Sequence, residues 1–337
     1  MVEMKGNSTI TISNIAKKAG VSPALVSSVL GGGKSSIRCS DVTRNKVLKV
    51  ASKLNYHIRE ANTFGLIHLA LTHAPSDGTW VHWIAPLLGS IHLQALNSDK
   101  LMSVFAYSLE ELDKQLKNDD LPQVFMRRKI DGLIITGAYS GKIIKYLDDI
   151  NMPWVFMNMR DSQNYSQDSI CFDEIFTGTQ ATRYLLKNGY KKNLHASVKG
   201  KIPHYSEFQR LQGYNTTMDQ AGYDSRYAYL VDEDFDSFKK NITEMLTNKD
   251  RPDAIFAYNE RVAFLCYNVL NKLGLTVEEI PIITVAWYEK ETCRILGIPY
   301  IELPAQEMGK RAFEILLKRV SDRKHVPGIL LRGEIRS

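Results

Sequence analysis

The chain has 337 residues, of which 44% are hydrophobic and 24% charged, values typical of a globular protein with more than one domain. No apolar run reaches the length of a membrane span, and the first ten residues are too short and polar for a signal peptide, so we expect a cytoplasmic protein. The cysteines are scattered, without C-x-x-C or zinc spacing, which predicts reduced thiols and no metal or other cofactor.

The formal net charge of +6 is concentrated near the N-terminus. Residues 1–62 carry ten Lys or Arg against three Asp or Glu, a net of +7, which leaves −1 for residues 63–337. A small basic segment on a near-neutral body is typical of a protein in which only that segment meets a polyanion. A solvated basic face without a ligand explains the charge equally well, so the charge only supports the interpretation that follows.

Three helices are predicted before residue 60. The first, 12–19, has apolar side chains on one face and ends at Gly20, which suits a left-handed C-cap. The second, 22–30, opens with Ser-Pro, an N-cap followed by a favoured first helical residue. The third begins at the N-cap Ser40. This order is the helix-turn-helix pattern, in which the second helix can lie in the major groove of DNA.

From Phe64 onward, apolar strands alternate with amphipathic helices. The predicted strands are Phe64–Leu71, Leu101–Tyr107, Ile130–Thr136, Trp154–Asn158, Asn193–Val198, Arg226–Val231, Ala254–Ala257 and Ile280–Val285. The clearest helices are Val81–Leu96, Ile175–Asn188, Phe208–Ala221 and Arg261–Leu273. Helical crossovers imply parallel sheets, and this many units exceeds one sheet. The predicted fold class is α/β, an all-α head followed by two doubly wound lobes with a ligand cleft.

The head also carries a specific series of segments. They are Asn14-Ile15-Ala16, Ala19-Gly20-Val21-Ser22, Val26-Ser27-Ser28-Val29-Leu30, and then Ser40, Thr43-Arg44, Lys46-Val47, Ala51, Leu54 and Tyr56. In this register the head resembles that of the LacI family of bacterial regulators. Weaker matches continue at 130–135, 210–214, 252–260 and 307–312, where the body is similar to periplasmic sugar-binding proteins.

The resemblance implies a sequence-specific transcription regulator, a repressor and not an enzyme. It implies a homodimer, pairing through helices such as Val81–Leu96, whose operator affinity responds to a small molecule, a sugar or related metabolite, held between two lobes. The implied domains are a DNA-binding head (1–58), a linker (59–64) and a body (65–337), with lobe one about 65–159 and 289–320 and lobe two about 160–288 and 321–337. The alternative is a small-molecule-binding protein without regulatory DNA binding.

Site residues follow from the same resemblance. It places base-reading residues at Pro23, Ala24 and Ser28, and phosphate contacts at Thr11, Ser22, Ser27, Ser40 and Thr43, although a helix cap explains each single hydroxyl at least as well. The effector-binding candidates are Trp83, Asn158, Arg160, Asp173, Arg210, Asn259 and Trp287. The alternatives are core packing for Trp83, an exposed helix position for Arg210, and a helix N-cap for Asp173, which is slightly favoured.

Two departures from the family pattern stand out. Only eight residues separate Tyr56 from Gly65, so the family's hinge segment, whose leucine kinks DNA, is expected to be missing. Where the family has an aspartate that holds ligand hydroxyls, this chain has Ala286 next to Trp287. The short Ser28 and the apolar Pro23 and Ala24 offer no bidentate arginine contact to guanine, so base reading is expected to use thymine methyls, water or DNA shape.

Overall fold

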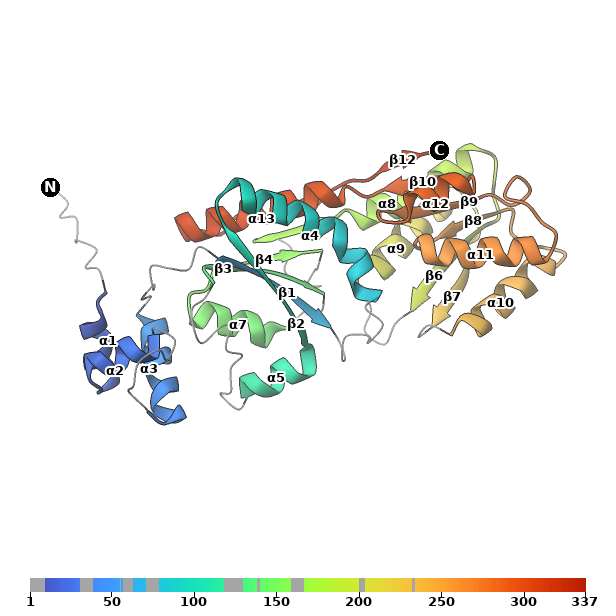
Figure 1. Ribbon diagram of the computed structural model, residues 1–337. Coiled ribbons are helices and arrows are strands. Elements are labelled where there is room, and N and C mark those ends of the chain that lie inside the picture. The colour runs from blue at the N-terminus through green and yellow to red at the C-terminus, as the bar shows by residue number, and fades with distance from the viewer. Residues whose placement is uncertain are drawn as a thin grey trace. The chain divides into compact units, whose positions relative to one another are not determined.

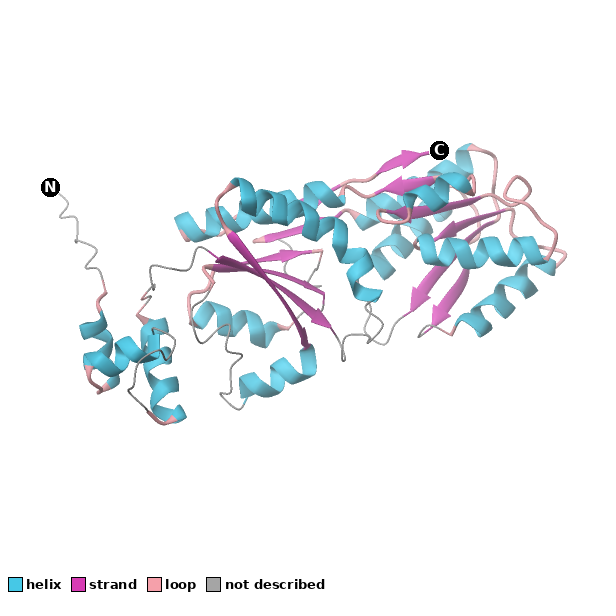
Figure 2. Cartoon of the chain, in the orientation of Figure 1, coloured by secondary structure: helices cyan, strands magenta, loops and turns pink. Residues whose placement is uncertain are grey.

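The computed structural model describes residues 10–30, 39–54, 56, 63–70, 79–117, 130–137, 140–158, 167–199, 204–231 and 234–337 (Figure 1). Helices and strands alternate through the body, after an all-helical start (Figure 2). The predicted linker lies outside the described residues except for its last two positions, which begin the first strand. The expected loss of the hinge segment therefore also falls outside them. None of the helices in the described ranges combines the length and hydropathy needed to cross a bilayer.

The head consists of α1 (Ile12–Ala19), α2 (Pro23–Leu30) and α3 (Asp41–Lys53). The predicted turn is confirmed: Gly20 caps α1 in the left-handed conformation, with φ 65° and ψ 40°. Side chains from all three helices share one small core, in which Ile15, Val26 and Val47 are fully buried. This core fixes α2 against α1 and leaves the opposite face of α2 at the surface.

The first sheet has the strand order β11-β5-β4-β3-β1-β2. Its strands are β1 (Thr63–Ala70), β2 (Leu101–Ser108), β3 (Gly132–Gly137), β4 (Trp154–Met157), β5 (Ser169–Phe172) and β11 (Ile329–Leu331). The helices that follow or precede these strands in the chain are α4 (Thr79–Asn97), α5 (Leu109–Lys117), α7 (Gly141–Asp149) and α13 (Ala305–Asp322). The pairs β1–β2, β1–β3, β4–β5 and β5–β11 are parallel, as predicted for strands joined by helical crossovers.

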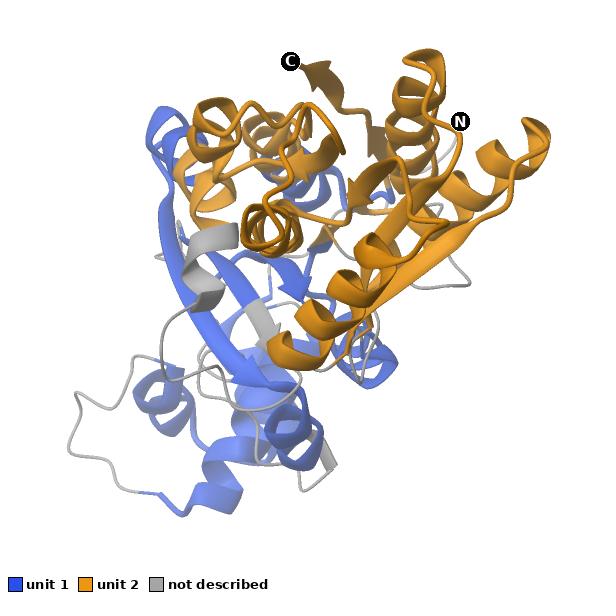
Figure 3. Ribbon diagram, turned by 90° about the vertical axis from the view of Figure 1, so that its right-hand side faces the viewer, with its two compact units in different colours: residues 1–74, 92–155, 313–325 blue, residues 75–91, 156–312, 326–337 orange. Residues whose placement is uncertain are grey.

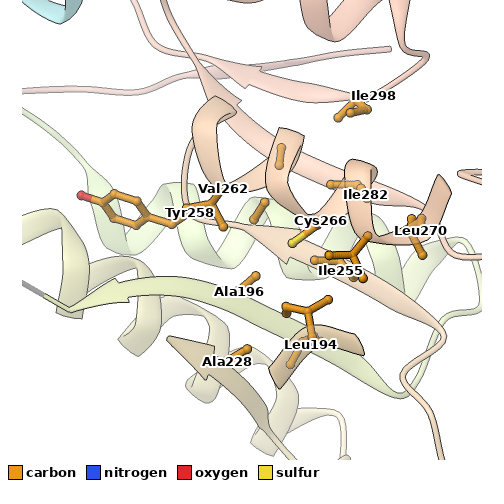
Figure 4. Packing of buried hydrophobic residues seen from close by; sticks show 14 of the residues in the cluster. Leu194, Ala196, Ala228, Ile255, Tyr258, Val262, Cys266, Leu270, Ile282 and Ile298 are labelled. Carbon is orange, nitrogen blue, oxygen red and sulfur yellow. The ribbon is translucent and has the colours of Figure 1, made fainter. Parts of the chain in front are cut away.

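The second sheet has the order β12-β10-β9-β8-β6-β7. Its strands are β6 (Asn193–Lys199), β7 (Arg226–Val231), β8 (Ala254–Ala257), β9 (Ile282–Ala286), β10 (Tyr300–Glu302) and β12 (Glu334–Arg336). The helices are α8 (Glu174–Lys187), α9 (Tyr205–Gln220), α10 (Phe235–Thr247), α11 (Glu260–Lys272) and α12 (Lys290–Ile295). Leu194, Ile255 and Ile282 on neighbouring strands pack with Cys266 and Leu270 of α11 in one buried cluster (Figure 4). The apolar, β-branched strand sequences follow from this two-sided burial.

The sheets divide the chain differently from the predicted lobe bounds. β5 and β11 fall in the range predicted for lobe two but belong to the first sheet, and β10 falls in the range predicted for lobe one but belongs to the second sheet. The reason is strand pairing: β5 joins β4 and β11, and β10 joins β9 and β12. β12 also runs antiparallel to β10, at the edge of an otherwise parallel sheet.

The chain forms two compact units (Figure 3). Unit 1 comprises residues 1–74, 92–155 and 313–325, and unit 2 comprises residues 75–91, 156–312 and 326–337. Three of the five boundaries fall inside elements, namely α4, β4 and α13. The site described below in the body lies wholly within unit 2.

Candidate nucleic-acid interface and effector site

The leading end of α2 lies at the surface of the head. Ser22, Pro23, Ala24 and Ser27 are exposed, whereas Ser28 is buried, with 8% of its surface accessible. The Ser22 hydroxyl accepts a hydrogen bond from the backbone N–H of Leu25 at 3.2 Å, so it caps the helix as predicted. The first turn of α2 therefore has small, exposed residues, and the buried Ser28 contributes little to that face.

Thr11 caps α1 in a reciprocal arrangement. Its hydroxyl accepts from the Asn14 N–H at 3.4 Å, while the Asn14 side chain accepts from the Thr11 backbone N–H at 2.8 Å and from its hydroxyl at 2.6 Å. At α3, the Ser40 hydroxyl accepts from the Thr43 N–H at 3.2 Å, and the two hydroxyls lie 2.9 Å apart. The cap alternative is thus confirmed for Thr11 and Ser40, and their phosphate contacts stay a prediction.

Exposed basic side chains lie on the other two helices of the head. Lys17 and Lys18 are exposed on the last turn of α1, and Lys46 and Lys49 are exposed on α3. The Lys46 ammonium lies 3.9 Å from the position that a Cβ would take at Gly20, which places this side chain beside the α1–α2 turn. Asp41 is the single acidic residue among the described head residues. The excess of positive charge favours association with a polyanion.

In unit 2, Arg210 of α9 forms a bidentate ion pair with a neighbouring carboxylate. Its Nε and Nη2 donate to the two Glu174 carboxylate oxygens at 2.6 and 2.8 Å, and Nη1 donates to the Tyr258 carbonyl oxygen at 2.5 Å. The Arg210 and Glu174 side chains are 6% and 1% exposed. Burial alone would lower the pKa of Arg210, but the Glu174 charge and hydrogen bonds outweigh it and raise that pKa. The arginine is charged and its fork is occupied from within the protein.

The approach of α8 to α9 explains how this pair forms. Gly178 of α8 faces the backbone of Arg210, and a Cβ at Gly178 would lie 2.9 Å from the Arg210 Cα. Gly213 of α9 faces α8, and a Cβ there would lie 2.8 Å from the Thr179 nitrogen. Two helices that cross on glycines approach backbone to backbone. That crossing brings Glu174, one turn before Gly178, beside Arg210, one turn before Gly213.

A second chain of hydrogen bonds extends from the start of α9. The His204 Nδ1 accepts from the Ser206 N–H at 3.4 Å and lies 2.7 Å from its hydroxyl, so Nε2 donates to the Asn158 carbonyl at 3.0 Å. The Ser206 and Tyr258 hydroxyls are 2.6 Å apart, and the Tyr205 hydroxyl donates to the Asn158 side-chain oxygen at 3.0 Å. Burial lowers the pKa of His204, which keeps the ring neutral and consistent with these roles.

Glu260 holds the loop that follows β9. One oxygen of its buried carboxylate accepts from three consecutive backbone N–H groups, those of Trp287 (2.8 Å), Tyr288 (3.3 Å) and Glu289 (3.4 Å). Burial raises the pKa of Glu260, and the three N–H donors oppose that rise. The Trp287 ring, partly buried, lies 5.3 Å from the Phe172 ring.

The structure places the predicted effector residues as follows. Asn158 and Arg210 are connected through His204, Ser206 and Tyr258. The other described candidates are Trp287, on the loop after β9, and two helix caps. Asp173 caps α8 through the Phe176 N–H (3.1 Å) and pairs with Arg332 (3.0 Å). Asn259 caps α11 through the Val262 N–H (3.0 Å). The favoured cap at Asp173 is confirmed. Arg160 and the Trp83 side chain lie outside the described residues.

Sequence reasoning missed Glu174, His204 and Glu260. One signal was available for Glu174: it lies four residues before Gly178, so it shares the helix face on which that glycine permits close packing. A carboxylate on such a face predicts a buried cationic partner. His204 and Glu260 carry no comparable pattern, because their partners are backbone groups of distant segments.

Comparison with known proteins agrees with this organisation. Residues 11–58 match the bacterial regulatory proteins of the lacI family, and residues 111–331 match the periplasmic binding proteins and sugar binding domain of the LacI family. The chain is 25% identical to the ribose operon repressor of Haemophilus influenzae, over 93% of this chain and 92% of that protein. It is 24% identical to the transcriptional repressor PurR of Aliivibrio salmonicida, over 94% and 93%.

Solved structures show the same fold. The lac repressor dimer bound to operator and the anti-inducer ONPF matches with a TM-score of 0.64 and 19% identity, covering 98% of each chain. The complex of the transcriptional regulator CelR with cellobiose matches with a TM-score of 0.67 and 18% identity, over 97% of this chain and 98% of that one. The helix-turn-helix head, the two sheets and these family matches together show that the chain belongs to the LacI family of bacterial transcriptional repressors.

Proposed function

We propose that the repressor reads its operator with the first turn of α2, through Pro23 and Ala24, with Ser27 at a phosphate. The observation that carries this proposal is the exposed leading end of α2, in a head whose α1 and α3 carry exposed basic side chains. Small apolar side chains can contact thymine methyls and follow groove shape, but they cannot donate to guanine. We therefore expect modest discrimination at any single base pair and a steep loss of affinity with salt.

A gel shift with the gene's own upstream DNA tests this proposal. Ala24→Asp places a carboxylate in the first turn of α2, where the helix dipole tolerates it, so the head stays folded while phosphate repulsion weakens binding by about tenfold or more. Thr216→Asp, on an exposed position of α9 in unit 2, is the matched control and should bind like the wild type. No shift by a wild-type dimer at low salt, or equal binding by Ala24→Asp, would contradict the proposal.

For the effector, we propose a small metabolite that binds in unit 2 beside Trp287 and Asn158. The similarity to a ribose operon repressor and to the CelR–cellobiose complex supports a sugar or related molecule as the effector. The loop after β9 is hydrogen-bonded to Glu260, and its Trp287 ring packs against Phe172. These contacts support a rigid aromatic surface in the effector site. Since operator DNA is the partner of the head, we place the working protein in the cytoplasm.

We also propose a homodimer formed through unit 1. Leu93 and Leu96 on α4 are 54% and 62% exposed, and Leu101 and Val104 on β2 are 68% and 48% exposed. β2 is an edge strand of its sheet. Large apolar side chains that gather along consecutive elements at the surface mark a protein-protein interface more often than chance exposure does. The lac repressor match, itself a dimer, supports the same assembly.

A further inference from the structure

We infer that Glu174 acts as a built-in ligand of Arg210, so that this repressor rejects effectors that carry a carboxylate or phosphate and responds to an uncharged molecule. The inference rests on the proposed effector site in unit 2 and names its ligand class. A guanidinium fork recognises carboxylates and phosphates through two parallel N–H···O bonds. Glu174 already makes both bonds, at 2.6 and 2.8 Å.

Arg210 makes two further contacts and is almost entirely buried, with 5% of its surface accessible. Nη1 donates to the Tyr258 carbonyl at 2.5 Å, and the guanidinium carbon lies 4.6 Å from the Tyr258 ring centroid. An anionic ligand would have to displace Glu174 and leave that carboxylate buried without its cation. Separating a buried, hydrogen-bonded ion pair weakens such binding by at least about 100-fold.

The geometry also makes it costly for Glu174 to move aside. It belongs to the first turn of α8, and α8 is fixed against α9 by the Gly178 and Gly213 crossing. Its side chain is 1% exposed, so no neighbouring solvent can receive the displaced charge. The pair is therefore a permanent feature of the folded unit rather than a gate that an ordinary ligand opens.

Chemical rescue with acetate tests this inference in the full-length protein. Glu174→Ala removes the internal carboxylate and leaves a space beside Arg210 of about the size of acetate. We expect acetate and formate to raise the melting temperature of this variant by about 3 °C or more once they exceed their Kd tenfold. The wild type should show no such rise. Glu307→Ala, which removes the carboxylate of the exposed Glu307–Arg311 pair on α13, is the matched control and should also show none.

The same titration covers the case in which Glu174→Ala does not fold alone. Folding that depends on added acetate or formate counts as rescue, and failure of both anions to restore it counts against the inference. Glu174→Gln, which keeps the side-chain volume, should gain a smaller rise with formate. An acetate-dependent rise in the wild type equal to that of Glu174→Ala would overturn the inference, as would no rise in either Glu174 variant. A parallel gel shift reports operator binding separately, so a failure of the proposed function remains distinguishable.

Discussion

The glycine crossing between α8 and α9 yields a prediction that can be worked from the geometry. Gly213→Ala would place a methyl group 2.8 Å from the Thr179 nitrogen and in collision with the Ile175 carbonyl oxygen. Both obstacles are backbone atoms, so no side-chain rotation relieves the overlap. The two helices must separate by about half an ångström or more to reach ordinary van der Waals contact.

The expected cost is substantial. Overpacking of this kind costs about 1–3 kcal/mol, and the upper end applies because the obstacle is backbone. Alanine recovers about 1 kcal/mol of helix propensity relative to glycine. The net loss in the free energy of unfolding is therefore about 2 kcal/mol, or about 4–8 °C in melting temperature for a unit of this size. Separation of the helices also loosens the bidentate fit of Arg210 on Glu174.

Urea unfolding followed by circular dichroism provides the measurement, with Gly89→Ala as the matched control. Gly89 lies in α4, and an added Cβ meets nothing within 4 Å, so this variant should be as stable as the wild type or more stable by up to about 1 kcal/mol. If Gly213→Ala unfolds at the same urea concentration as Gly89→Ala, the close crossing does not exist, and the account of how Arg210 meets Glu174 fails with it.

Three further predictions concern the head, the pH response and the assembly. Ser22→Ala should lower the stability of the head by about 1 kcal/mol by removing a helix cap, whereas Ser27→Ala should weaken DNA binding without a change in melting temperature. Burial lowers the pKa of His195 to about 4, below its unfolded value of about 6.5. The stability that the neutral ring contributes above pH 6.5 is therefore lost as the pH falls toward 4. The melting temperature of His195→Phe should fall less steeply than that of the wild type over this pH range. Leu96→Asp should shift the protein toward monomer in analytical ultracentrifugation, and an unchanged dimer would exclude this face.

The head was predictable because its determinants are local. A few neighbouring residues are enough to predict the cap at Ser22, the left-handed conformation of Gly20 and the apolar face of each helix. The first helix of the structure begins and ends at the predicted residues. The strands of the body were predictable where they are long and apolar, as at Gly132–Gly137. Here local propensity and the global fold agree.

The short strands and the partner of the buried Arg210 were not predictable, because their determinants lie outside the local sequence. Ser169–Phe172 and Tyr300–Glu302 are too short to show a period, and only the strands with which they pair decide which sheet each one joins. Arg210 could be assigned to the site by resemblance, but its partner lies 36 residues earlier in the chain. Only the crossing of two helices brings them together, and the local signal at Glu174, four residues before Gly178, does not identify which residue is its partner.

The occupied fork of Arg210 bears on how an effector can control this repressor. A ligand shifts an equilibrium only through a difference in its affinity for the two states. Because Glu174 holds Arg210 with or without a ligand, that arginine contributes no such difference. In the effector site that we propose, groups other than Arg210 supply that difference, and the Trp287 ring on the loop that Glu260 holds is the largest apolar one. Coupling free energies of about 1–3 kcal/mol are typical of allosteric proteins. At about 25 cal/mol per Å², burial of about 40–120 Å² more apolar surface in one state supplies that amount, which part of one aromatic ring can provide without any charged contact.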